Sequence, residues 1–184
     1  MWSSDRRAVL RLLAVTGLGG LTAGCFQPMY GDPKVVASAG LDDKLATVEV
    51  APINQPNGTR LARIGVALRD DLLFKLDRGH GAAAPLYRLD IQITASQQQV
   101  IVDINSGRPD IQNYGIDAVY TLTDLATKKP MFRATTFSRV TYNIPGQQQR
   151  FAGERGLRDA ENRAAEVIAD NIHARLASFF VAGT

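Results

Sequence analysis

The sequence predicts an α+β domain in which a four-stranded, mostly antiparallel sheet carries two helices packed on one face. Three observations lead to this prediction. Apolar residues recur at three- and four-residue spacing in two segments, which is typical of helices. They recur at every second residue in three longer segments, which is typical of half-buried strands. Short turn sequences separate these strands and favour antiparallel hairpins, so the predicted order of elements is β-α-β-β-β-α.

The first predicted strand covers residues 45–50 and is stopped by Pro52. The first predicted helix covers residues 61–77, and either Asn57 or Thr59 is placed to cap its N-terminus. Its apolar stripe contains Leu68 and Leu72, with charged residues on the other side.

The remaining elements are three strands and a long helix. Residues 86–104 alternate between apolar and polar side chains, but the phase shifts partway along, which predicts a bulge near residues 97–99. Two further strands follow at residues 114–122 and 131–142, after turns that contain Pro109 and Pro130. The second helix covers about residues 155–180, and its apolar stripe includes Ile168 and Ile172.

Each predicted helix has one apolar stripe and each predicted strand has one apolar face. The simplest way to bury both is to place the two helices on the same side of the sheet. We therefore expect Leu68, Leu72, Ile168 and Ile172 to be buried. The opposite face should be polar and of mixed charge, and it should present Arg88, Asp90, Gln92, Thr94, Asp117, Thr121, Thr123, Arg133, Thr135 and Arg139.

The N-terminal segment has the pattern of a bacterial lipoprotein signal peptide. Arg6, Arg7 and Arg11 flank an apolar run at residues 12–21 that is too short to span a membrane, and Cys25 follows two small residues. We expect residues 1–24 to be removed, residues 25–44 to form a lipidated tether, and residues 45–184 to form one domain. The alternative interpretation of this lone cysteine is a small buried thiol. The sequence also leaves open whether the protein is exported by the Sec pathway or by the twin-arginine pathway.

Net charge argues against a nucleic-acid partner. The chain has 21 Lys and Arg against 18 Asp and Glu, but the predicted signal contains Arg6, Arg7, Arg11 and Asp5. The mature chain would keep 18 basic and 17 acidic side chains, so any attraction to an anion must come from a local cluster.

The sequence gives no positive sign of an enzyme. Its two histidines, His80 and His173, lack the spacing of a metal site, so we expect no metal and no catalytic residue. The basic residues leave two interpretations open. They are either solvated turn and surface charges or a phosphate-binding site, for which the candidates are Arg108 at one hairpin tip, Lys128 and Lys129 at the other, and Arg133 beside them.

Three segments together resemble the LptE family of lipopolysaccharide-assembly lipoproteins. The first begins at the lipidation site and lacks one residue of the family pattern after the cysteine: Gly24-Cys25-Phe26-Gln27-Pro28-Met29-Tyr30-Gly31. The second, residues 120–130, is similar to the family's hairpin between the third and fourth strands, although Lys129 stands where glycine is frequent. The third is the alanine-rich C-terminal helix.

This resemblance implies a non-enzymatic lipoprotein on the periplasmic face of the outer membrane, with Phe26 at the sorting position. Family members plug the β-barrel LptD, assist its assembly and bind lipopolysaccharide. A polar sheet face suits a wet barrel lumen, and no cofactor is implied beyond the diacylglycerol and acyl chain on Cys25. Two alternatives remain open: an accessory lipoprotein of a periplasmic lipid-trafficking ABC transporter, which would co-purify with an inner-membrane complex, and a lipid-anchored hydrolase, which lacks a recognisable nucleophile.

Lipidation at Cys25 is directly testable by mass spectrometry of the intact protein. The membrane-bound form should lack residues 1–24 and should carry the added mass of acyl chains on Cys25. The Cys25→Ser variant should be neither processed nor retained in the membrane fraction. If that variant were still processed and anchored, the lipoprotein prediction would be wrong.

Overall fold

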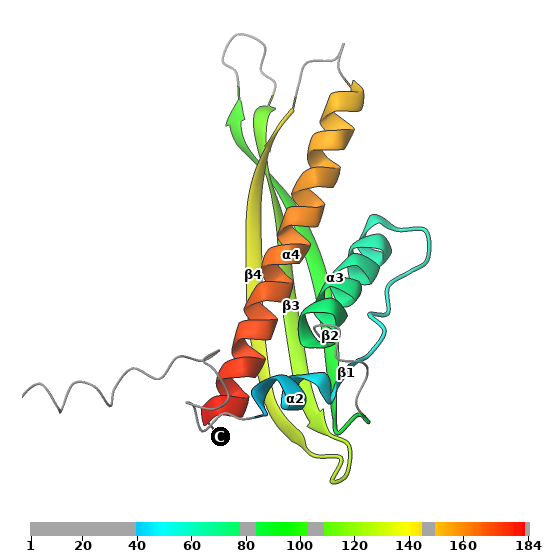
Figure 1. Ribbon diagram of the computed structural model, residues 1–184. Coiled ribbons are helices and arrows are strands. Elements are labelled where there is room, and N and C mark those ends of the chain that lie inside the picture. Colours follow the sequence, from blue (N-terminus) through cyan, green and yellow to red (C-terminus); the bar gives the residue numbers. More distant parts are fainter. Residues whose placement is uncertain (1–39, 78–83, 103–108, 145–149, 183–184) are drawn as a thin grey trace, which may run out of the picture. The chain divides into compact units, whose positions relative to one another are not determined.

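The computed structural model describes residues 40–77, 84–102, 109–144 and 150–182. The described residues from Leu41 onward belong to one compact unit. Its elements, in chain order, are α2 (Leu41–Ala46), β1 (Val48–Val50), α3 (Arg60–Asp77), β2 (Tyr87–Val102), β3 (Pro109–Asp124), β4 (Pro130–Asn143) and α4 (Arg150–Ala182). The sheet order is β1-β2-β3-β4 (Figure 1). The α+β class and the predicted arrangement are confirmed, with one short additional helix, α2.

The parallel pairing of β1 and β2 follows from the helix between them. Parallel neighbours need a crossover connection, and α3 supplies it, so β1-α3-β2 is a βαβ unit. Of the two predicted caps, Thr59 is the one that caps α3, because its Oγ1 accepts a hydrogen bond from the backbone N–H of Ala62 at 3.1 Å. Farther along α3, the Nε of Arg69 donates to the carbonyl oxygen of Val50 at 3.1 Å, which ties the helix to the end of β1.

Long antiparallel pairing joins β2, β3 and β4. Gln97, Gln98 and Gln99 pair regularly with β3, and the bulge that was predicted near these residues lies directly after them, with Val100 as the extra residue on β2. The register shifts on either side of Ile101. Val100 and Ile101 are consecutive apolar residues, so the alternation of apolar and polar side chains in the sequence did not show which of them faces the core.

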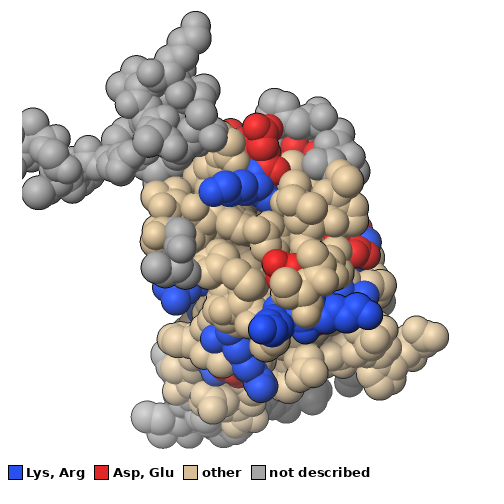
Figure 2. All heavy atoms as spheres, turned by 90° about the horizontal axis from the view of Figure 1, so that it is seen from below, with Lys and Arg blue, Asp and Glu red and all other residues tan. Residues whose placement is uncertain are grey.

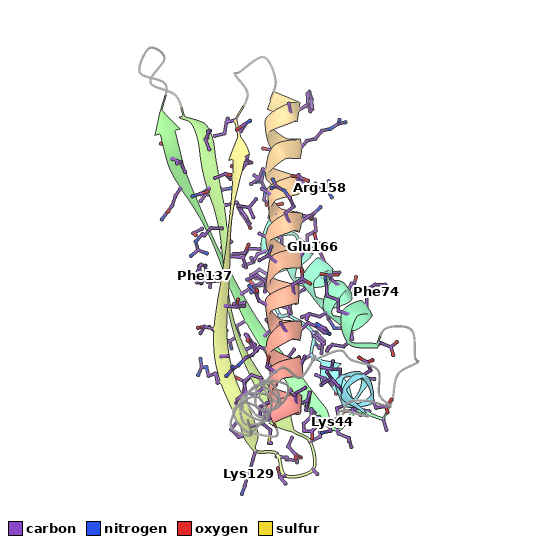
Figure 3. All side chains as sticks on the ribbon, turned by 60° about the vertical axis from the view of Figure 1, so that its left-hand side comes forward. Lys44, Phe74, Lys129, Phe137, Arg158 and Glu166 are labelled. Carbon is purple, nitrogen blue, oxygen red and sulfur yellow. The ribbon has the colours of Figure 1, made fainter. Side chains whose placement is uncertain are left out.

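Both helices cover the same face of the sheet, as predicted (Figures 1 and 3). Leu68 and Leu72 of α3 and Ile168 and Ile172 of α4 are all fully buried. They pack over the apolar face of the strands, whose buried side chains are Leu89, Ile91, Ile93, Tyr114, Ile116, Ala118, Tyr120, Leu122 and Tyr142. Among the described helices, none combines the length and apolar content needed to cross a membrane.

Three element boundaries differ from the sequence prediction by three residues or more. β3 begins at Pro109, in the segment predicted to be a turn, and not at residue 114. The first strand is only Val48–Val50, because Leu41 and Leu45 lie four residues apart on one buried face of the short helix α2. The last helix begins at Arg150, before its two glycines. A Cβ atom at Gly156 would make ordinary van der Waals contact, 3.5 Å from the carbonyl oxygen of Asn143, so packing does not require glycine there.

The layer arrangement predicts that alanine substitutions at two neighbouring β-branched residues of α4 change stability by very different amounts. Ile168 is fully buried against the sheet, whereas Val167 is exposed. Ile168→Ala should lower the free energy of unfolding by about 2–5 kcal/mol, because it leaves a cavity in the core. Val167→Ala should change it by about 0.5 kcal/mol or less. Urea denaturation followed by circular dichroism measures both, and equal losses would contradict this placement of the core.

Candidate functional site

The turn between β3 and β4 has a defined backbone. The carboxylate Oδ1 of Asp124 accepts hydrogen bonds from the backbone N–H groups of Ala126 and Thr127, at 2.8 and 3.0 Å. The N–H of Asp124 donates to the carbonyl oxygen of Lys129 at 3.0 Å. Lys128 has a φ of 55°, the left-handed conformation that glycine or asparagine adopts more readily. The two lysines are therefore presented on an ordered loop.

Three of the cations near this turn lack an acidic partner among the described residues. Lys128, Lys129 and Arg133 make no ion pair and no side-chain hydrogen bond there. Two other arginines of the open sheet face are paired: Arg88 with Asp90 at 3.2 Å, and Arg139 with Asp117 at 2.8 Å. Among the described cations of this turn and of the open sheet face, the unpaired ones are thus Lys128, Lys129 and Arg133, which were predicted as phosphate ligands.

Figure 2 views the protein from the end that carries this turn. Lys and Arg side chains gather over the lower part of that view, where few Asp and Glu side chains lie. Figure 3 shows Lys129 at the tip, directed away from the rest of the sheet. An anion approaching this end meets exposed ammonium groups first.

The fourth predicted phosphate ligand, Arg108, lies outside the described residues. Pro109 and Asp124 are the two ends of β3, about 50 Å apart at ~3.3 Å per residue, and the lysine turn follows Asp124. The described part of the candidate site is therefore Lys128, Lys129 and Arg133.

Exposed apolar side chains lie beside these cations. Leu86 is next to the turn, because its carbonyl oxygen accepts the N–H of Leu125 at 3.0 Å, and its side chain is 56% exposed. Met131 lies two residues before Arg133 on β4 and is 45% exposed. Cations next to accessible apolar groups suit a ligand that carries both phosphates and hydrocarbon chains.

The open sheet face presents the polar side chains that the sequence predicted, together with one aromatic residue that it missed. Phe137 is 67% exposed and is labelled in Figure 3 on the side away from the helices. The guanidinium of Arg139 lies 5.5 Å from the centre of its ring. Gly115 makes room for Arg139, since a Cβ atom there would come within 2.8 Å of the arginine Cδ. Its exposure could have been predicted from the sequence, because Phe137 is out of phase with the apolar side of β4.

A second polar cluster, between α3 and α4, has a structural role. Arg63 pairs with the buried carboxylate of Glu161 and also donates to Asn162 at 2.9 Å. Burial raises the pKa of the nearby Tyr114 to about 12, and the charge of Glu161 adds to this effect. Since the contacts of Arg63 with Glu161 and Asn162 join α3 to α4, this cluster holds the two helices together.

No group of metal-ligating side chains occurs among the described residues. His173 lies in α4 and is partly buried, and His80 lies outside the described part of the chain. Lys75 has a raised pKa because it donates a hydrogen bond to Asp170 at 2.7 Å, which links α3 to α4. The side chains that the structure brings together at the sheet end can bind an anion or an amphiphile, but they offer no nucleophile.

Solved structures of bacterial lipoproteins share this helix-on-sheet fold. A putative lipoprotein from Caulobacter crescentus aligns with a TM-score of 0.58 and 22% identity, covering 78% of this chain and 97% of that one. The rare lipoprotein B from Shewanella oneidensis aligns with a TM-score of 0.51 and 14% identity, covering 73% and 96%. Comparison with curated protein sequences finds no match.

A family model identifies the particular group within this class. The model for LptE, described as lipopolysaccharide-assembly, matches residues 45–176. The match begins just before β1 and extends into the last turns of α4, so it includes the whole sheet. The chain belongs to the LptE family.

Proposed function

We propose that this protein is an outer-membrane lipoprotein that is anchored through acylated Cys25 and faces the periplasm. In this role it plugs an LptD-class β-barrel, assists assembly of that barrel, and binds lipopolysaccharide during export to the outer leaflet. The observation that carries the proposal is the LptE family match over residues 45–176, together with a described structure in which the sheet end offers unpaired cations. No catalytic step is part of this function.

The open face of the sheet supports the barrel part of the proposal. Neither helix covers this face, and most of its side chains are polar or charged, including Arg88, Asp90 and Thr121. A barrel lumen is wet, and polar surfaces with trapped water make stable contacts without being dry. Phe137 adds a single aromatic side chain of the kind that often anchors an interface.

The lysine turn supports the lipopolysaccharide part. The lipid portion of that molecule carries phosphates next to acyl chains, and this end of the sheet places Lys128, Lys129 and Arg133 next to exposed Leu86 and Met131. Charge-assisted hydrogen bonds to phosphate are stronger than neutral ones, so unpaired cations are the appropriate donors. Arg88 and Arg139 contribute less, because Asp90 and Asp117 already neutralise them.

Titration with lipopolysaccharide tests the proposed ligand site. The Lys128→Glu/Lys129→Glu variant should bind roughly fivefold more weakly or worse, since it loses about 1 kcal/mol or more of charge-assisted contacts. The loss should shrink at high salt, because exposed charges are screened over about 8 Å at physiological ionic strength.

The matched control is Arg155→Glu/Arg158→Glu, which changes net charge by the same amount near the start of α4, far from the lysine turn (Figure 3). This variant should bind like the unchanged protein. Circular dichroism verifies that both variants fold. Unchanged affinity in a folded Lys128→Glu/Lys129→Glu protein, or equal losses in both variants, would show that the lysines are ordinary solvated turn charges.

A further inference from the structure

The outer edge of β2 is unpaired along much of its length within the described residues. β1 pairs only with Tyr87–Leu89, and the N–H of Ala51 extends this pairing by one hydrogen bond to the carbonyl oxygen of Leu89, at 3.0 Å. β2 itself continues to Val102. Because β1 is the only described strand on this side, the edge beyond Leu89 is open to another strand.

Hydrogen bonds already made by β2 show which backbone groups face outward. The N–H of Tyr87 donates to Thr47, and the carbonyl oxygen of Ile93 accepts the side-chain amide of Gln55 at 3.2 Å. Backbone groups alternate sides along a strand, and pairing with β3 is regular up to Gln99. Ala95, Gln97 and Gln99 therefore direct their N–H and C=O groups outward, and no described residue binds them.

This edge also lacks the features that normally prevent strand addition. Natural edge strands carry lysine, proline or inward charges that block pairing with another chain. The other edge of this sheet, β4, begins at Pro130 and carries Arg133 and Arg139. By contrast, residues 94–100 of β2 are Thr-Ala-Ser-Gln-Gln-Gln-Val, without a charge or a proline.

A groove of about 710 Å³ borders the first part of this edge. One wall is formed by the connection after β1 and the start of α3, with Pro52, Asn54, Gln55 and Leu61, and the other by residues 90–95 of β2. Domains that recognise peptides by strand addition use backbone hydrogen bonds for affinity and adjoining pockets for alternate side chains. The side-chain amide of Gln55 already donates to the carbonyl oxygen of Ile93, which is a hydrogen bond that the backbone of an added strand would otherwise make.

We propose that the β2 edge from Ile93 to Gln99 accepts an extended, uncharged segment of the barrel partner by β-strand addition, with its side chains entering the adjoining groove. The identity of this occupant depends on the proposed function. A peptide matches the edge because it supplies alternating N–H and C=O groups, whereas a phosphorylated lipid offers no N–H ladder to pair with outward carbonyls. The added segment continues the line of β1, which ends at Val50.

Amide hydrogen exchange tests this inference on the unmodified chain, alone and in complex with the LptD-class barrel of the same organism in mild detergent. Exchange at the outward amides of Ala95, Gln97 and Gln99 should slow by about tenfold or more in the complex, as expected when each gains a hydrogen bond. The amides of Thr94 and Ser96 face β3 and are already paired, so they should change little.

A proline variant tests the same edge by affinity. Ala95→Pro removes an outward N–H and should fold, because proline is tolerated in edge strands where the N–H does not bind a neighbour. It should reduce barrel binding by about tenfold, the equivalent of one lost backbone hydrogen bond. The matched control is Ala95→Ser, which changes the same exposed position but keeps its outward N–H, and it should bind normally.

The outcomes separate this inference from the proposed function. If the complex forms but exchange at Ala95, Gln97 and Gln99 is unchanged and Ala95→Pro binds normally, strand addition is wrong and the proposed function stands. If no complex forms, both are overturned. If these amides become protected in the isolated chain as its concentration rises, a second copy occupies the edge and the barrel is not its partner.

Discussion

The apolar side chains of β2, β3 and β4 all project from one face of the sheet, and α3 and α4 have to cover that face together. Strand side chains alternate between the two faces, so every core residue such as Ile91 or Tyr120 implies an exposed neighbour. With both helices on one side, nothing in the described chain shields the other side. The open face and the unpaired edge that we propose as partner surfaces are direct consequences of how the core is buried.

The contacts between α3 and α4 hold this layer in place. Along their interface Arg60 pairs with Glu154, Arg63 with Glu161, and Lys75 with Asp170. Exposed pairs of this kind contribute little stability, but Glu161 is buried, and removing its partner would leave a desolvated charge. These pairs fix α3 over β1 and the start of β2. Because β1 is so short, the rest of the β2 edge stays free, beside the groove that ends at Ala95.

Much of this fold could be predicted from periodicity alone, because the strands and helices are long and their patterns regular. The four core residues Leu68, Leu72, Ile168 and Ile172 were predicted correctly. Short-range features were missed: α2 depends on burial of Leu41 and Leu45 against the rest of the domain, and the first turns of α4 contain two glycines, which weaken the helix pattern in the sequence. For the candidate site, the sequence identified the cations but not their partners. Arg88 and Asp90 are same-face neighbours on β2, which the alternation in the sequence already implied, but the pairing of Arg139 with Asp117 depends on the register between β3 and β4.

If the sheet face without helices is the surface that meets the barrel, site-specific photo-crosslinking in cells should capture that contact. A photoreactive phenylalanine analogue would replace either Phe137 on that face or Phe74 on α3, which are 67% and 77% exposed (Figure 3). Similar exposure of the two positions makes them a matched pair. The account predicts a crosslink to the LptD-class barrel from Phe137 and none from Phe74. A crosslink from Phe74 alone would contradict it, because the helical face would then be the one in contact with the barrel.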